Sequence, residues 1–265
     1  MIPEERRQML FGFLSKNEYT SLHTIFQSFP QISPSTIRRD LQVLTSEGRV
    51  ILLRGGAKIA DSENRYDLPI DSKLQINTLA KKQMSFYAAA LVRDGDVVYL
   101  DSSSSVYPIL QYISAKNVTI VTAGIYTAMR AMKLGFKCII TGGTINNDNG
   151  SIVGNITDNQ VNNIHFNIAF MSANGFSAQY GITSTYQEEV SKMNIIRSNS
   201  DSTYMLMDNT KLGQNFMYRI FGLEDVHIIS DAPCDLADRC LSFTVADKII
   251  ASEDDTTIYD EEEYL

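Results

Sequence analysis

Most of the chain alternates short apolar segments with helical ones, and this alternation restricts the fold more than any other feature of the sequence. Strands that alternate with helices predict an α/β domain with a mainly parallel sheet. In such sheets ligands bind beyond the carboxyl ends of the strands, so a site is expected there. The residues ahead of the first strand, 73–93, are predicted to form a helix. The predicted strands are 97–100, 118–121, 138–140, 168–171, 202–207 and 226–229.

The first sixty residues follow a different pattern, that of a small helical domain. Apolar residues at helical spacing predict helices over 3–17 and 21–29. Ser33-Pro34 is an N-cap followed by proline at the first helical position, so a third helix begins there and ends at Gly48. Residues 50–53 and 57–60 flank Gly55-Gly56 as a predicted hairpin. This layout is that of a winged helix-turn-helix.

The face of the third helix that turns away from its apolar stripe carries groups that suit DNA. Hydroxyls and helix-start N–H groups suit phosphate oxygens, and arginine suits phosphate or guanine. Basic residues of the hairpin are expected near its tip. A small helical bundle with solvated basic residues is the alternative. The predicted DNA-contacting residues are Ser33, Ser35, Thr36, Arg38, Arg39, Gln42, Arg54 and Lys58.

Charge is distributed unevenly along the 265 residues, which carry 23 Lys/Arg and 31 Asp/Glu for a formal net charge of −8. Residues 1–60 contain eight basic and five acidic residues, so this segment is at +3 and the remainder at −11. Seven of the acids lie between Glu253 and Glu263 and are interpreted as a solvated tail. DNA contact is therefore expected on one small basic face only.

Small hydroxylated residues and glycines follow several of the predicted strands. Asp101 precedes a run of serines, Thr122 and Gly142-Gly143 end the next two strands, and Lys211 follows the fifth. Such residues let backbone N–H groups approach an anion at a helix start, and a lysine adds a positive charge. The sequence therefore predicts a site for a phosphorylated small molecule.

Two short motifs carry a resemblance to a known family. Residues 36–41 read TIRRDL and residues 54–57 read RGGA, which resembles the N-terminal signature of DeoR-family transcriptional regulators. The resemblance continues with DSSSS at 101–105, where the family has DSGTT, and DNTK at 208–211, where it has DSSK. It implies a sensor domain related in fold to ribose-5-phosphate isomerases and an effector that is a phosphorylated sugar.

Carried over position by position, the resemblance assigns the effector site. The chain departs from the family pattern in three ways: Ser103 replaces the loop glycine, serines replace both loop threonines, and Ala123 replaces an asparagine. The implied effector-binding residues are Asp101, Ser102, Ser103, Ser104, Ser105, Thr122, Gly142, Gly143, Asn174, Glu188 and Lys211.

These expectations combine into one organisation. A winged helix-turn-helix at 1–60 is joined by a linker, 61–74, to a Rossmann-like α/β effector-sensing domain at 75–252, followed by an acidic tail at 253–265. The expected protein is a cytoplasmic, homo-oligomeric repressor of sugar-metabolism genes, without a cofactor, a metal or a membrane span. The alternative is a sugar-phosphate isomerase-like enzyme or binding protein with a vestigial DNA head. An isomerase needs carboxylates to move a proton, and residues 171–175, MSANG, lack them.

Overall fold

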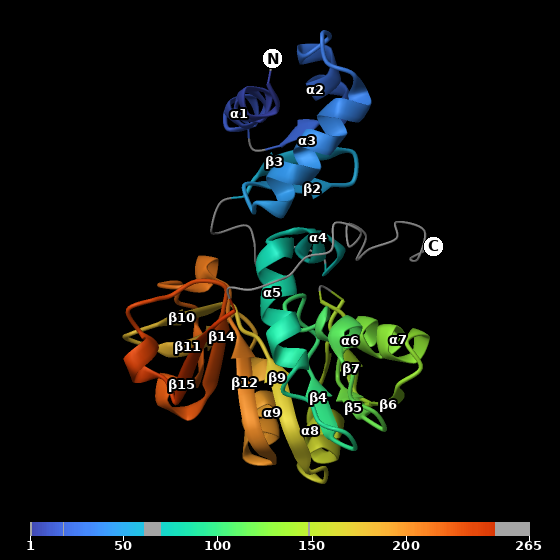
Figure 1. The fold of residues 1–265 in the computed structure, drawn as a ribbon, viewed down its shortest axis with the longest axis vertical. Helices are drawn as coiled ribbons and strands as arrows, with labels where there is room; N and C mark the ends of the chain where they lie inside the picture. Colours follow the sequence, from blue (N-terminus) through green and yellow to red (C-terminus); the bar gives the residue numbers. More distant parts are fainter. Residues whose placement is uncertain (1, 18, 61–69, 148, 247–265) are drawn as a thin grey trace. The chain divides into compact units, whose positions relative to one another are not determined.

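The computed structural model describes residues 2–17, 19–60, 70–147 and 149–246 (Figure 1). They form two compact units, one ending at Leu79 and the other beginning at Ala80. We call the first the head and the second the sensor domain, and describe each by itself.

The head is a winged helix-turn-helix. A three-stranded sheet in the order β1-β3-β2 accompanies three helices. Because β2 and β3 are antiparallel and joined at residues 54–55, they form the predicted wing. The elements are α1 (Pro3–Leu14), β1 (Thr20–Ser21), α2 (Leu22–Ser28), α3 (Pro34–Ser46), β2 (Val50–Leu53) and β3 (Gly56–Ile59).

Serine caps set the starts of two head helices. Ser21 Oγ accepts the amide N–H of Thr24 at 3.1 Å, and Ser33 Oγ accepts that of Thr36 at 3.2 Å. The apolar stripe of α3 is fully buried in the head core, as its spacing predicts. The first helix is shorter than predicted and ends at Leu14.

The helix predicted over 73–93 is in fact two helices, α4 (Ile70–Gln75) and α5 (Thr78–Ala89). They are separated at Asn77, whose φ of 54° interrupts the helical backbone. Ile70 and Leu74 are buried one turn apart, so α4 packs against α3 and β2 of the head. The end of the predicted linker is therefore helical, while 61–69 and the acidic tail lie outside the described residues.

The sensor domain is built on a seven-stranded sheet, entirely parallel, in the order β15-β14-β12-β9-β4-β5-β6. From the adjacent β4 and β9 the strand order runs outward in opposite directions, which makes the gap between them a topological switch point. The strands are β4 (Val97–Leu100), β5 (Thr119–Thr122), β6 (Lys137–Ile140), β9 (Phe166–Met171), β12 (Ser200–Leu206), β14 (His227–Ser230) and β15 (Ser242–Val245).

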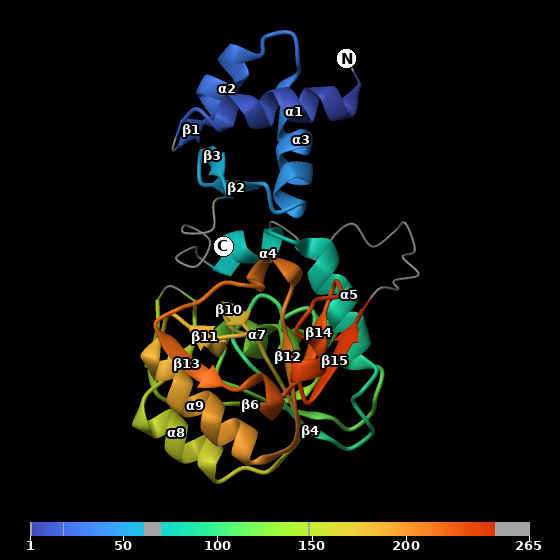
Figure 2. The same ribbon diagram turned by 90° about the vertical axis from the view of Figure 1, so that its left-hand side faces the viewer.

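Helices flank this sheet (Figure 2), and a hydrophobic layer lies on each of its faces. One packs α5, α6 (Ile109–Tyr112) and α7 (Ile125–Lys133) on one face. The other packs α8 (Asn155–Asn162) and α9 (Gln187–Ser198) on the opposite face. An antiparallel sheet joins the second layer and consists of β10 (Gly175–Ser177), β11 (Gly181–Ser184) and β13 (Tyr218–Phe221). A hairpin of β7 (Thr144–Ile145) and β8 (Ile152–Val153) completes the domain.

The α/β class and a mainly parallel sheet are confirmed. Each of the six predicted strands overlaps a strand of the large sheet, with ends within two residues of those predicted. The sequence did not predict β15 or the antiparallel sheet. Glycine, serine and threonine occupy much of β10 and β11, so these strands lack the apolar run used to identify the others.

Candidate DNA-reading face and effector site

The exposed face of α3 carries the residues predicted to contact DNA. Ser33, Ser35, Arg38, Arg39 and Gln42 are exposed, while Thr36 is half-buried. The guanidinium of Arg38 lies over the Phe26 ring, 5.4 Å from its centroid, which limits the directions it can take. Arg39 has no ion-pair partner among the described residues, so its charge is available to an anion.

A buried ion pair orients this helix. Arg6 of α1 binds Asp40 of α3 through two hydrogen bonds, one from Nε to Oδ2 and one from Nη2 to Oδ1 at 2.9 Å. The Asp40 side chain is 4% exposed and that of Arg6 17%. The acid of the TIRRDL motif therefore faces the interior and holds α3 against α1.

The wing departs from the prediction in two details. Arg54 is exposed at the turn, where Gly55 has a φ of 84° that suits glycine. Lys58 pairs with Ile51 in the β2–β3 ladder, so it lies along the wing and not near its tip. The β3 strand also begins one residue earlier than predicted, at Gly56.

In the sensor domain, Asp101 bridges the switch point. It follows β4, and its carboxylate accepts the amide N–H of Ser103 at 2.8 Å and that of Ser172, which follows β9, at 2.7 Å. Burial raises the pKa of Asp101 to about 6, against the opposing effect of these hydrogen bonds. The carboxyl group is thus a weaker acid than an exposed aspartate.

Lys211 lies beside the same switch point. Its ammonium donates to Ser172 Oγ at 2.6 Å and to Ser105 Oγ at 3.2 Å, and lies 3.9 Å from an oxygen of Asp208. Burial lowers the pKa of Lys211, although Asp208 and Asp101 oppose this. Burial alone would raise the pKa of Asp208, but Lys211 and the hydrogen bonds from Thr210 lower it. Residues that follow three strands, β4, β9 and β12, therefore meet here.

The serine run forms a tight turn instead of opening a helix directly, since α6 begins only at Ile109. The Ser103 carbonyl accepts the N–H groups of Val106 at 3.2 Å and Tyr107 at 3.1 Å. Ser104 and Ser105 are buried, and their own N–H groups have no acceptor among the described residues. Two neighbouring N–H groups without acceptors can both donate to one anion, so this turn is suited to bind one. Ser102 is half-buried beside Gly124.

Thr122 and the two glycines are held by neighbouring elements. Thr122 Oγ1 accepts the Gly124 N–H at 2.9 Å. Gly142 donates its N–H to Gln160 Oε1 at 2.6 Å, so this amide is already occupied. At Gly143, φ is 146° and a Cβ atom would stand 2.3 Å from Thr157 Oγ1. The glycine loop is thus pinned to α8.

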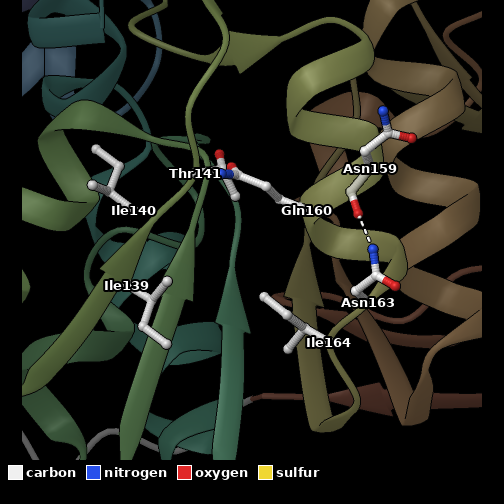
Figure 3. A pocket seen from close by; sticks show the side chains of 7 residues that line it. All are labelled: Ile139, Ile140, Thr141, Asn159, Gln160, Asn163 and Ile164. Atoms are coloured by element: carbon white, nitrogen blue, oxygen red, sulfur yellow. Dashed lines mark hydrogen bonds between the residues drawn. The ribbon is translucent and has the colours of Figure 1, made fainter.

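Below this loop, β6 and α8 enclose a cleft of about 440 Å³ (Figure 3). Its walls carry apolar and amide side chains, and no charged group lines it. The cleft therefore lacks the cation that a phosphate needs. The residues lining it are Ile139, Ile140, Thr141, Asn159, Gln160, Asn163 and Ile164.

The structure distinguishes two neighbouring glutamates on α9. Glu188 is exposed, whereas Glu189 forms an ion pair with Lys192 at 2.8 Å, and its charge acts on Asp101. Lys192 is 1% exposed. The Oε1 atom of Glu189 is buried without a hydrogen-bond partner among the described residues. Of the two, Glu189 is the partly buried one whose charge acts on Asp101, whereas Glu188 faces solvent.

Asn174 connects two loops of the sensor domain through hydrogen bonds. Its Oδ1 accepts Ser184 Oγ–H at 3.1 Å and the Thr185 N–H at 3.3 Å. These bonds tie the loop after β9 to the segment that leads into α9. Asn174 thus helps to set where the glutamates of that helix lie.

Sequence reasoning missed three residues of this cluster: Ser172, Glu189 and Lys81. Ser172 directly follows β9, so the strand-end rule could have identified it. Lys81 lies on α5, is 5% exposed, and lowers the pKa of Asp208 through its charge. Nothing in the local pattern distinguishes it from the adjacent Lys82.

Comparison with known proteins identifies both units. Residues 6–63 match the DeoR-like helix-turn-helix domain, and residues 76–232 match the DeoR C-terminal sensor domain. The second match alone covers more than half of the chain. Among the described residues, no helix combines the length and apolar character needed to cross a membrane.

Curated relatives match over most of their length. The transcriptional regulator GolR of Listeria innocua is 27% identical, covering 80% of this chain and 84% of the relative. The transcriptional repressor GlcR of Bacillus subtilis is 26% identical, covering 90% and 94%. The uncharacterized regulator YgbI of Escherichia coli is 30% identical, covering 81% and 84%.

Among solved structures, ribose 5-phosphate isomerase from Plasmodium falciparum aligns with a TM-score of 0.38 and 17% identity, covering 51% of this chain and 53% of that one. The family matches and the curated relatives decide between regulator and enzyme, because relatives that match over most of this chain are named transcriptional regulators. The chain belongs to the DeoR family and is a DNA-binding transcriptional regulator, not an enzyme.

Proposed function

We propose that this regulator represses genes of sugar metabolism and that a phosphorylated sugar bound at the switch point releases it from DNA. The names of two relatives support repression: GlcR of Bacillus subtilis and the putative aga operon repressor of Escherichia coli O157:H7. DNA contact is assigned to the exposed face of α3 and to the wing turn, where Arg38, Arg39 and Arg54 are exposed.

One observation carries the effector proposal. The Lys211 side chain, 15% exposed, donates from its ammonium to Ser105 Oγ, in a turn of buried residues whose N–H groups at 104 and 105 have no acceptor among the described residues. A phosphate bound there would accept from these N–H groups and from Lys211 together. Asp101, whose pKa burial raises to about 6, is mainly ionised at neutral pH and can accept a hydrogen bond from a sugar hydroxyl.

The test compares the wild type with Lys211→Met, and uses the exposed Lys116→Met as a charge-matched control. Inorganic phosphate and a panel of pentose and hexose monophosphates are screened by thermal unfolding, followed by gel shifts on DNA upstream of the gene. We expect a sugar phosphate to raise the melting temperature of the wild type and of the control, and to release both from DNA.

The Lys211→Met variant should bind DNA as tightly as the wild type without being released. The proposal fails if no sugar phosphate stabilises or releases the wild type. If DNA binding falls in Lys211→Met without ligand, the lysine supports the structure of the domain and the assignment of its role is wrong.

A further inference from the structure

Helix α5 carries two buried polar side chains that the proposed function leaves unexplained. Lys81 is 5% exposed, and Ser85, one turn further on, is fully buried. Lysine is rarely buried to this extent unless it is paired. Ser85 Oγ donates to the carbonyl oxygen of Ser105 at 3.4 Å. This helix is therefore attached directly to the serine turn of the proposed anion site.

Lys81 brings a second positive charge to the same place. Its charge and that of Lys211 both act on the buried Asp208 and lower the pKa of this carboxyl group. A buried ammonium has lost much of its hydration, so an added anion nearby interacts with it strongly. A phosphate group at the turn would compete with Asp208 for both lysines.

The helix that precedes α5 in the chain, α4, belongs to the head. Across Asn77, α5 continues back into α4. Ser72 Oγ of α4 donates to the Leu52 carbonyl of the wing at 3.4 Å. Ile76 packs against Ile51, and α4 also contacts α3. The two elements that carry the predicted DNA contacts, α3 and the wing, are therefore both in contact with α4.

We propose that Lys81 detects whether the anion site is occupied, and that α5 transmits the resulting shift through Asn77 to α4 and hence to α3 and the wing. The inference rests on the proposed function, because it requires a phosphorylated ligand at the serine turn. Binding moves part of the Lys81 interaction from Asp208 to the phosphate, and Ser85 follows the turn. The ligand thus acts on DNA affinity through its different contacts in the two states, typically by about 5- to 150-fold.

The first experiment uses Lys81→Met, with Lys82→Met on the same helix as the matched control and Lys81→Arg as the conservative variant. The probe is the sugar phosphate that most raises the melting temperature of the wild type. At saturating probe, confirmed by the plateau in melting temperature, we expect Lys81→Met to lose at least nine-tenths of the wild-type change in DNA affinity, with its ligand-free affinity within about twofold of wild type. Lys81→Arg and Lys82→Met should respond normally. A full response of Lys81→Met at saturation would overturn the proposal.

A second variant tests whether α5 transmits the effect of the ligand to α4, and it leaves the proposed effector site unaltered. The same variant also provides the test if Lys81→Met does not fold. Two glycines inserted after Asn77 leave all effector and DNA contacts in place but make the α4–α5 connection flexible. The insertion should retain both the ligand-induced rise in melting temperature and DNA binding, while the ligand no longer changes DNA affinity. If DNA affinity still responds, α5 is not the route.

Failure of the proposed function gives a different result. In that case no sugar phosphate raises the melting temperature of the wild type. Failure of the present inference alone leaves that rise intact and leaves DNA release intact in Lys81→Met or in the glycine insertion.

Discussion

Arg6 and Asp40 form a two-hydrogen-bond ion pair that joins the first helix of the head to the helix that carries the proposed DNA-reading face. The motif that contains Asp40 thus has two separate tasks. Its arginines, Arg38 and Arg39, face outward, while its acid faces the interior and holds the helix in place.

This division predicts that Asp40→Asn lowers the melting temperature of the head by several degrees and weakens DNA binding, because the guanidinium of Arg6 is left without its charged partner and α3 is no longer held. Glu47→Gln is the matched control, since Glu47 forms only an exposed ion pair with Arg49 at 3.5 Å. Thermal unfolding and gel shifts measure both effects. Equal melting temperatures of the two variants would contradict this role of Asp40.

The two arginines of the reading face predict a salt-dependent weakening of DNA binding. In Arg38→Ala and Arg39→Ala, the slope of log affinity against log salt should flatten by about one unit for each DNA phosphate that the variant no longer binds. Lys116→Ala, an exposed lysine of the sensor domain, should leave the slope unchanged. Fluorescence anisotropy between low and physiological salt gives the slopes. If affinity and slope are unchanged in both arginine variants, this face does not bind DNA.

Asp101 predicts a pH dependence of stability. Burial raises its pKa from 3.8 to about 6, so the folded domain holds this proton more tightly than the unfolded chain does. Stability of the sensor domain therefore falls as the pH rises from about 4 to about 6, by about 3 kcal/mol from this group. The Asp101→Asn variant has no ionisable group at this position, so its stability lacks this pH-dependent contribution.

The free energy of unfolding is measured in urea at pH 4 and at pH 7 for both proteins. Relative to the wild type, Asp101→Asn should be more stable at pH 7 than it is at pH 4. A difference between the two proteins that stays constant over this range would show that the Asp101 carboxyl is not desolvated.

The adjacent glutamates of α9 offer an internal comparison. Glu189→Gln removes the charge that pairs with the buried Lys192, so stability should fall. The same charge acts on Asp101, so the effector response should fall as well. Glu188→Gln alters an exposed side chain and should change neither. Thermal unfolding with and without the sugar phosphate distinguishes them. A larger loss of effector response in Glu188→Gln than in Glu189→Gln would instead assign Glu188 to the effector site.

Local sequence signals were sufficient for much of the fold. Ser33-Pro34 specifies the start of α3 because the cap and the fixed φ of proline act within one turn. The central strands are buried on both faces and read as continuous apolar runs. The break at Asn77 was missed, since apolar residues continue through it and a single left-handed residue leaves no mark in the periodicity.

The site was less accessible to sequence reasoning. Asp101, Ser105 and Lys211 were predicted and do meet, because each lies at a strand end of the same sheet. Glu189 was missed because successive helical residues point about 100° apart, and only the packing of α9 decides which one faces inward. Lys81 was missed because a lysine is ordinarily expected to be exposed to solvent, whereas this one is buried.

The strand order has a consequence for the lifetime of the folded protein. Asp101 and Ser105 come from the half of the sensor domain before the switch point, and Ser172 and Lys211 from the half after it. A molecule bound to both sides is a noncovalent cross-link between two halves of one chain. Such a cross-link slows their separation and so protects the domain against proteolysis. If an effector ends repression as proposed, it would thereby also lengthen the survival of the regulator.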